Sequence, residues 1–258
     1  MKNEYILFID SGIGGLSTLA FTQKILKANY IYFADNKNAP YGSHTKNEIL
    51  KYLTKIISNV QNKYPLKMVV LACNTATTSA VKQLRNLFDI PIIGTEPAIT
   101  LAKNNGYNHV FALTTETTKK QLKEKLKKHS TPIVKVHSSK TLAKNIENLK
   151  SNNTFENYLN VLKDVCNSIY HAQNHDVIVL GCTHYVLIRE IFQKFTTKPL
   201  LEGNFGVVKQ ILSNFFKTTN QKAQNRDIVF IFSKPTKFAK QKYKKILGQI
   251  LANLWNLC

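Results

Sequence analysis

Two cysteines in this 258-residue chain occupy matching positions, and their thiols could carry protons to and from a substrate. Cys73 follows the run Met68-Val-Val-Leu-Ala, and Cys182 follows the run Val177-Ile-Val-Leu-Gly, so the two segments are near copies of each other. A short apolar run of this kind is typical of a strand buried in a parallel sheet. We therefore expect each thiol at the carboxyl end of a strand, with one thiol on each side of a bound molecule.

Thiols in these positions can act in turn as base and acid. A free thiol has a pKa of about 8.5, and a nearby helix N-terminus can lower it, so a thiolate and a thiol can coexist near neutral pH. Inverting a carbon centre requires a proton to leave one face and another to arrive on the opposite face. The pair therefore favours a racemase that needs no cofactor and no metal. A single buried cysteine is often only a small hydrophobe, but that alternative does not explain a matched pair.

A carboxylate also follows a strand near the start of the chain. Asp10 ends the apolar run that begins at Tyr5, and it opens the glycine-rich loop Ser11-Gly-Ile-Gly-Gly15. The loop lacks the G-x-G-x-x-G spacing of dinucleotide sites, so it is a weak signal for phosphate binding. A strand-end carboxylate lies where open sheets bind ligands. Aspartate is equally a common helix N-cap, and both interpretations of Asp10 remain open here.

Short β-branched runs alternate with helical stretches along the chain, which predicts an α/β fold of two similar doubly wound domains. Each domain would have a mainly parallel sheet, and both would face one central cleft. We expect the first domain at 1–94 plus 206–258, with Cys73, and the second at 95–205, with Cys182. Thr45 and Glu48 form the pattern of a capping box at a helix start. The expected strands are 5–9, 30–34, 68–72, 110–113, 133–136, 177–180 and 228–232.

Composition limits the compartment and the partners. The four cysteines, at 73, 166, 182 and 258, form no disulfide framework or metal-type pair, which indicates a reducing compartment. The chain opens on a strand rather than a signal peptide, and no apolar run approaches the ~20 residues that span a bilayer. We expect a cytoplasmic protein without a membrane partner. The oligomeric state stays open, with a homodimer among the alternatives.

The formal net charge of +21 raises the alternative of nucleic-acid binding. Arginine, whose planar fork suits bidentate phosphate contacts, stands only at positions 85, 189 and 226. The excess is therefore lysine, which favours a generally lysine-rich surface over a specific nucleic-acid partner. A positive field would still help to gather a small dicarboxylate substrate.

Several segments together resemble the bacterial glutamate racemases over nearly the whole chain. The resemblance rests on motifs in the expected order and spacing, and it is most specific around the two cysteines. It implies two α/β domains that act on free glutamate without a cofactor and supply D-glutamate for peptidoglycan. His184 after Cys182 favours the glutamate enzymes, whereas a racemase of aspartate or another small amino acid is the alternative. The motifs are Asp10-Ser-Gly-Ile-Gly-Gly-Leu16, Ala39-Pro-Tyr-Gly42, Ala72-Cys-Asn-Thr-Ala76, Gly94-Thr-Glu-Pro-Ala98 and Gly181-Cys-Thr-His-Tyr185.

The same resemblance implies a role for individual residues. It assigns Cys73 to proton exchange with D-glutamate, assisted by Asp10, and Cys182 to exchange with L-glutamate, assisted by His184. Carboxylate acceptors would bind the substrate ammonium, and hydroxyl and backbone donors would bind its two carboxylates. The implied substrate-binding residues are Asp10, Ser11, Tyr41, Gly42, Asn74, Thr75, Thr118, Thr183 and His184.

The sequence departs from the family pattern in the second domain. Family members usually carry a glutamate after an apolar strand there, but the segment from Pro132 to Ser139 has no acid, and the next one is Glu147. His137 and Ser138 stand where the glutamate would be expected. In addition, Glu202-Gly203-Asn204 replaces a late Asp-Ser-Gly turn, and Val186 stands where a proline is usual.

Overall fold

The computed structural model describes residues 4–126, 133–217 and 227–254 of the chain. These residues form two compact units. Unit 1 takes the described residues up to Thr95 and from Asn204 onward, and unit 2 takes Glu96–Gly203. Each unit contains one sheet in which every neighbouring pair of strands is parallel. The predicted α/β class with two parallel sheets is thus confirmed.

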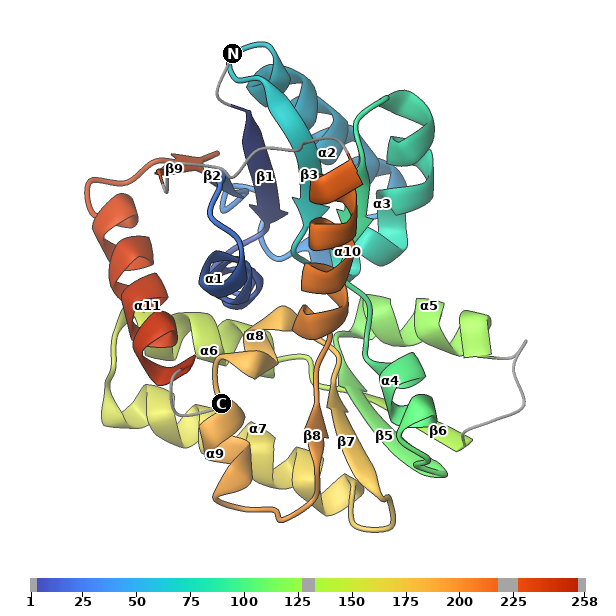
Figure 1. The fold of residues 1–258 in the computed structure, drawn as a ribbon. Helices are drawn as coiled ribbons and strands as arrows, with labels where there is room; N and C mark the ends of the chain where they lie inside the picture. Colours follow the sequence, from blue (N-terminus) through green and yellow to red (C-terminus); the bar gives the residue numbers. More distant parts are fainter. Residues whose placement is uncertain (1–3, 127–132, 218–226, 255–258) are drawn as a thin grey trace. The chain divides into compact units, whose positions relative to one another are not determined.

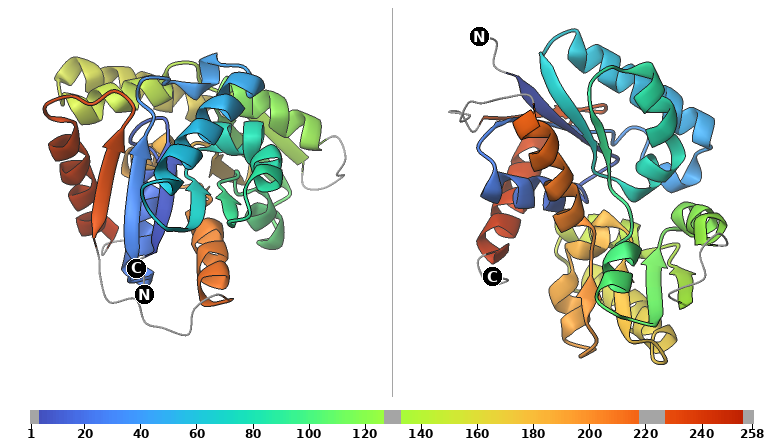
Figure 2. Two further views of the ribbon diagram at one scale, coloured as in Figure 1. Left: turned by 90° about the horizontal axis from the view of Figure 1, so that it is seen from above. Right: turned by 45° about the vertical axis from the view of Figure 1, so that its right-hand side comes forward.

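The sheet of unit 1 is built outward from its first strand. Its order is β4-β3-β1-β2-β9, so β1 lies between β2 and β3 (Figure 1). The last strand, β9, comes from the far end of the chain and pairs with β2 at the sheet edge (Figure 2). The bounds are β1 Tyr5–Asp10, β2 Asn29–Ala34, β3 Leu66–Leu71, β4 Ile92–Gly94 and β9 Ile228–Phe232.

Helices cover both faces of this sheet, because successive strand side chains point to opposite faces and both sets are apolar. Leu7 and Ile9 of β1 pack in one core with α2 and α3, whereas α10 and α11 pack with α1. The capping box predicted at Thr45 is present at the start of α2. The bounds are α1 Leu16–Ile25, η1 Tyr41–Ser43, α2 Lys46–Gln61, α3 Asn74–Leu87, α10 Asn204–Lys217 and α11 Ala239–Asn253.

Unit 2 repeats this plan with the strand order β6-β5-β7-β8. Val110 and Ala112 of β5 pack on the side of α4 and α5, whereas Phe111 and Leu113 pack on the side of α6 to α9. The strands are β5 His109–Thr114, β6 Ile133–Ser138, β7 Val177–Leu180 and β8 Leu200–Leu201. The helices are α4 Ile99–Asn104, α5 Glu116–Leu126, α6 Leu142–Ser151, α7 Phe155–His171, α8 Thr183–Val186 and α9 Arg189–Gln193.

All seven expected strands form. The strands β4 and β8 were not predicted, because two or three residues are too few to show a period. Cys258 lies outside the described residues.

Both units place a cysteine at the point where the strand order reverses. The chain goes from β1 to β2 on one side and then to β3 on the other, and it goes from β5 to β6 and then to β7 in the same way. Ligands of open parallel sheets bind at such reversals, outside the carboxyl ends of the strands. The backbone repeats here too: Ala72 N donates to Ile9 O over 2.9 Å, and Gly181 N donates to Leu113 O over 2.8 Å. Cys73 and Cys182 are the next residues.

Gly181 permits the close approach that places Cys182. A Cβ built at Gly181 would lie 2.7 Å from Cγ2 of Thr114 and 2.9 Å from the carbonyl oxygen of Leu113.

We predict that Gly181→Ala lowers the free energy of unfolding by about 1–3 kcal/mol, as overpacking of a filled site does. Gly248→Ala is the control: nothing lies within 4 Å of its Cβ in the exposed part of α11, so alanine should stabilise by up to ~1 kcal/mol. Urea unfolding followed by circular dichroism measures both, and an unchanged midpoint for Gly181→Ala would contradict the steric account.

Candidate functional site

In unit 1, the Asp10 carboxylate organises the glycine-rich loop. Asp10 is fully buried and accepts hydrogen bonds from the backbone N–H groups of Ser11, over 2.7 Å, and of Gly15. A Cβ at Gly15 would lie 2.7 Å from Cβ of Ala72, so this loop packs tightly against the residue before Cys73. The buried charge is thus stabilised by backbone donors, and Asp10 and Cys73 are brought to the same edge of the sheet.

Cys73 is the N-cap of α3, a helix of 14 residues. Its side chain is buried and forms no disulfide. The N-terminus of a helix carries about half a positive elementary charge, which favours an anion such as a thiolate. Asn74 and Thr75 follow in the first turn and are both buried, and Asn74 Nδ2 donates to the carbonyl oxygen of Thr95 over 3.3 Å.

Tyr41 lies beside these groups, but its hydroxyl is already engaged. The hydroxyl donates to Oδ2 of Asp35 over 2.8 Å, and Asn38 Nδ2 donates to both carboxylate oxygens of Asp35 at 3.0 Å. Burial raises the pKa of Tyr41 well above its usual value, and the nearby negative charge of Asp35 raises it further, with smaller contributions from Cys73 and Asp10. Tyr41 is therefore neutral, and the loop up to Gly42 is held by Asp35.

Asp35 is a residue of this site that the sequence interpretation did not select. It follows β2 directly and is fully buried, so it carries the same signal that drew attention to Asp10: a carboxylate after a strand of a parallel sheet. Its backbone N–H donates to the carbonyl oxygen of Asp10 over 2.8 Å, which ties the two strand ends together.

In unit 2, Cys182 begins a chain of three ionisable side chains. His184, which is 7% exposed, has its Nδ1 3.8 Å from Sγ of Cys182 and its Nε2 2.9 Å from Oε1 of Glu147. Cys182 is itself buried and is the N-cap of the four-residue helix α8. A thiol, an imidazole and a carboxylate in series can hold and move a proton.

The charge of His184 is set by its two partners. Burial alone would lower the pKa of this imidazole, but the hydrogen bonds to Cys182 and Glu147, together with their negative charges, raise it well above 6.5. Its two hydrogen-bonded neighbours thus favour the protonated, imidazolium form of His184.

The acid that was missing from 132–139 is found at Glu147, the next acid in the sequence, which contacts His184. The acid comes from α6 rather than from the end of β6, so no short motif marks it. His137 and Ser138 have other contacts: the ring of His137 stacks on Phe111, and Ser138 Oγ hydrogen bonds with Glu116 and with Lys119 Nζ. In the sequence, Glu147 is simply an acid on an amphipathic helix.

The helix that carries Glu147, α6, is held against its neighbour α7 by the partly buried carboxylate of Asp164. Asp164 accepts a hydrogen bond from Thr141 Oγ1 over 2.8 Å and another from Asn145 Nδ2 over 2.8 Å. Thr141 is the N-cap residue of α6 and Asn145 lies in its first turn, so Asp164 helps to set the position of α6 and therefore of Glu147.

Threonines complete this edge of unit 2. Thr118 is buried, and the Thr115 hydroxyl donates to Oγ1 of Thr118 over 3.1 Å. Thr183 is also buried, and its Oγ1 has no hydrogen-bond partner among the described residues. Buried hydroxyls are almost always paired. The Thr183 hydroxyl is therefore available to a ligand at the end of β7, next to Cys182.

Two further properties concern larger partners and metals. Within the described ranges, no three His, Cys, Asp or Glu side chains are grouped as metal ligands would be. None of the helices in that part of the chain combines the length and the apolar character that crossing a bilayer requires.

Comparison with known proteins now identifies the family. Residues 11–211 match the family model described as Asp/Glu/Hydantoin racemase. A glutamate racemase of Clostridium botulinum is 36% identical over 219 residues, which cover 81% of this chain and 83% of that protein. A glutamate racemase of Fusobacterium nucleatum is 34% identical, with 96% of each chain covered. The crystal structure of Escherichia coli glutamate racemase with L-glutamate and the activator UDP-MurNAc-Ala has a TM-score of 0.81 and 25% identity, covering 96% of this chain and 95% of that one. The chain is thus an isomerase of the Asp/Glu/Hydantoin racemase family, and by sequence it groups with the glutamate racemases.

Proposed function

We propose that this protein interconverts L- and D-glutamate by a two-base mechanism in which Cys73 and Cys182 exchange protons with opposite faces of the α-carbon. One observation carries the proposal: each unit ends the equivalent strand, at the reversal of its strand order, with a buried cysteine that caps a helix. The names of the relatives support glutamate as the substrate. They favour glutamate over the aspartate alternative.

The proposed reaction transfers one proton from each side. From D-glutamate, the Cys73 thiolate removes the α-proton, and the Cys182 thiol delivers a proton to the opposite face, which leaves a thiol at Cys73 and a thiolate at Cys182. From L-glutamate, the same steps run in reverse. Asp10 assists at Cys73, where it is positioned by the backbone N–H groups of Ser11 and Gly15. His184 assists at Cys182 and is held in turn by Glu147.

The polar groups at the two sheet edges suit a zwitterionic dicarboxylate. Carboxylate oxygens can accept from the substrate ammonium, and hydroxyl, amide and backbone N–H groups can donate to its carboxylates. The unpaired Thr183 hydroxyl is the clearest such donor. The product D-glutamate would serve peptidoglycan synthesis, and the protein would work in the cytoplasm. The proposed substrate-binding residues are Asp10, Ser11, Tyr41, Gly42, Asn74, Thr75, Thr118, Thr183 and His184.

The thiol pair is tested by single replacements. Cys73→Ser and Cys182→Ser should each lower kcat for glutamate racemisation by about 10³-fold or more, because a serine hydroxyl is far too weak an acid to supply an anion at neutral pH. Cys166→Ser is the matched control, since Cys166 is an exposed cysteine on α7, and it should stay within a small factor of wild type. Circular dichroism spectra and optical rotation measure fold and rate. Near-normal racemisation by either serine variant would exclude the two-thiol mechanism.

Deuterium incorporation from heavy water distinguishes a two-base mechanism from a single-base mechanism. In heavy water, D-glutamate formed from L-glutamate should carry deuterium at the α-carbon from the first turnover, whereas the remaining L-glutamate should stay largely protiated. The proton removed by one thiol is not the one that the other returns. A single-base enzyme would return the original proton, and mass spectrometry would then find mainly protium in the early product.

The Glu147 carboxylate is tested through the pKa of His184. Glu147→Gln removes a charge that raises this pKa, while burial still lowers it, so His184 should lose its proton at a lower pH than in wild type. NMR titration of histidine labelled at Cε1 measures the shift. Because the proposal has His184 act as an imidazolium, the racemisation rate of Glu147→Gln should begin to fall at a lower pH than that of wild type as pH rises.

The same substitution has a stability consequence. Because the folded pKa of His184 is raised, the stabilisation is complete below the unfolded pKa of about 6.5 and is lost as pH rises through the folded value. Glu147→Gln should therefore destabilise most at acidic pH. Glu116→Gln is the matched control in unit 2, since Glu116 contacts Ser138 and not His184. An unchanged His184 pKa in Glu147→Gln would contradict the role assigned to this carboxylate.

A further inference from the structure

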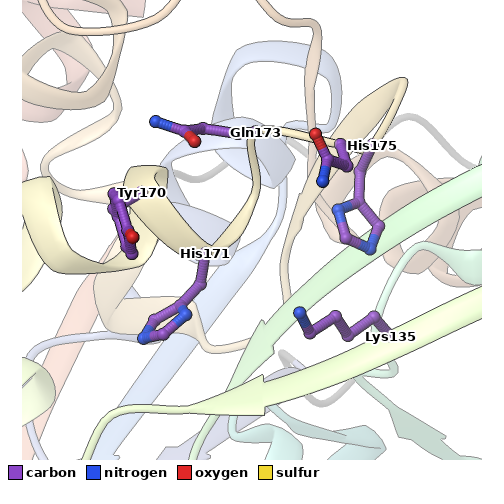
Figure 3. Close-up of a pocket in the computed structure, with 6 residues that line it drawn as sticks. Lys135, Tyr170, His171, Gln173 and His175 are labelled. Carbon is purple, nitrogen blue, oxygen red and sulfur yellow. The ribbon is translucent and has the colours of Figure 1, made fainter.

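A second group of polar side chains surrounds a hollow in unit 2, away from Cys182. The hollow measures about 230 Å³ and is lined from two segments that are separate in sequence, β6 and the stretch 170–175 (Figure 3). Lys135 comes from the middle of the edge strand β6, where it pairs with Phe111 of β5. Tyr170 and His171 end α7, and the remaining residues lie in the loop that leads into β7. The lining residues are Lys135, Tyr170, His171, Gln173, Asn174 and His175.

Every side chain that lines this hollow can donate a hydrogen bond, and none is a carboxylate. The ammonium group of Lys135 points into the space between the rings of His171 and His175 (Figure 3). The His175 ring is partly buried, and its Nδ1 atom is out of contact with solvent.

The charges that act on the imidazoles around this hollow are mostly positive. Burial lowers the pKa of His175, and the charge of Lys135 lowers it further. The pKa of His137, whose ring lies 4.6 Å from that of His171, is lowered in the same way by burial and then by neighbouring positive charges, with a smaller opposing effect of Glu116. The positive charges that lower these pKa values would attract a bound anion.

The carboxylates nearest in the sequence and the fold are already engaged. Asp176 accepts hydrogen bonds from the backbone N–H groups of Asn108 and His109, and it lies 3.6 Å from the His109 ring. Glu116 is bonded to Ser138. Lys198 adds a further cation, since its Nζ donates to the carbonyl oxygen of His175 over 2.6 Å. The C-terminal carbonyl groups of α7 at His171 oppose an anion, so the positive charges of Lys135 and Lys198 must outweigh them.

We propose that this hollow binds a small phosphate-bearing anion through Lys135, His171 and His175. Its volume lies below the roughly 300–1,000 Å³ of pockets for drug-sized ligands, which fits one small anionic group. A tetrahedral dianion accepts hydrogen bonds from several directions at once, and here an ammonium from β6 approaches along with imidazoles and side-chain amides from 170–175. A planar carboxylate would use fewer of these donors. The proposal does not depend on the proposed racemase function, because Lys135 and His175 lie away from the carboxyl end of β7.

Titration of the full-length protein with inorganic phosphate tests the proposal. The protein is labelled at histidine Cε1, ionic strength is held constant with chloride, and binding is followed by NMR and by calorimetry. We expect saturable shifts of His171 and His175 with a Kd of about 1 mM or tighter. Lys135→Gln and His175→Gln should each weaken binding at least tenfold. Lys163→Gln, an exposed lysine on α7 that does not line the hollow, is the matched control and should bind as wild type does.

Two further titrations define the ligand. O-phosphoserine tests a phosphate group on a small organic molecule, and acetate tests a carboxylate. Tighter binding of O-phosphoserine than of inorganic phosphate identifies an organic phosphate as the ligand class, and the reverse order identifies the free ion. Acetate binding as tight as phosphate binding, shifts that do not saturate, or binding that Lys135→Gln leaves unchanged would each overturn the proposal.

Discussion

Parallel strand pairing is the constraint on which the rest of the structure depends. Strands that all run the same way must end at the same edge of the sheet, so whatever follows β1 and β3 meets at one edge, and the same holds for β5 and β7. The helix that follows each strand begins at that edge and brings its N-terminal N–H groups with it. Asp10, Cys73 and Cys182 are therefore placed by backbone topology before any side-chain contact is made.

The two units differ in how they place a carboxylate near their cysteine. Asp10 and Thr114 are the last residues of equivalent strands, β1 and β5, yet only unit 1 has a carboxylate at this position. In unit 1 the acid is held by backbone N–H groups one and five residues away. In unit 2 the acid is Glu147, which lies on α6 and reaches the thiol only through His184. Two units with similar backbones thus carry different ionisable side chains beside their cysteines: Asp10 in unit 1, and His184 with Glu147 in unit 2.

This difference explains what could be predicted from the sequence. Cys73, Cys182 and Asp10 were found because each follows an apolar run directly, and the strand end is a local signal. Asp35 carries the same signal and could have been selected by it. Glu147 could not, since its contact with His184 joins residues 37 positions apart and depends on how α6 packs against α7. Likewise, β4 and β8 are too short to show a period, and they form because a paired strand lies beside them.

If the two thiols act as proposed, the lengths of the two capped helices explain why unit 2 would need an imidazolium and unit 1 would not. Cys73 caps α3, whose 14 residues align enough peptide dipoles to favour a thiolate at its N-terminus. Cys182 caps α8, which has only four residues and therefore contributes little of that field. His184 can replace the missing positive charge, but burial opposes its protonation. The hydrogen bonds to Cys182 and to the Glu147 carboxylate, with the charges of these two groups, offset that penalty and raise the pKa of His184. Under the proposed mechanism, Glu147 on α6, acting through His184, and the N-terminus of α3 have the same role. Each would stabilise a thiolate at the end of a buried strand.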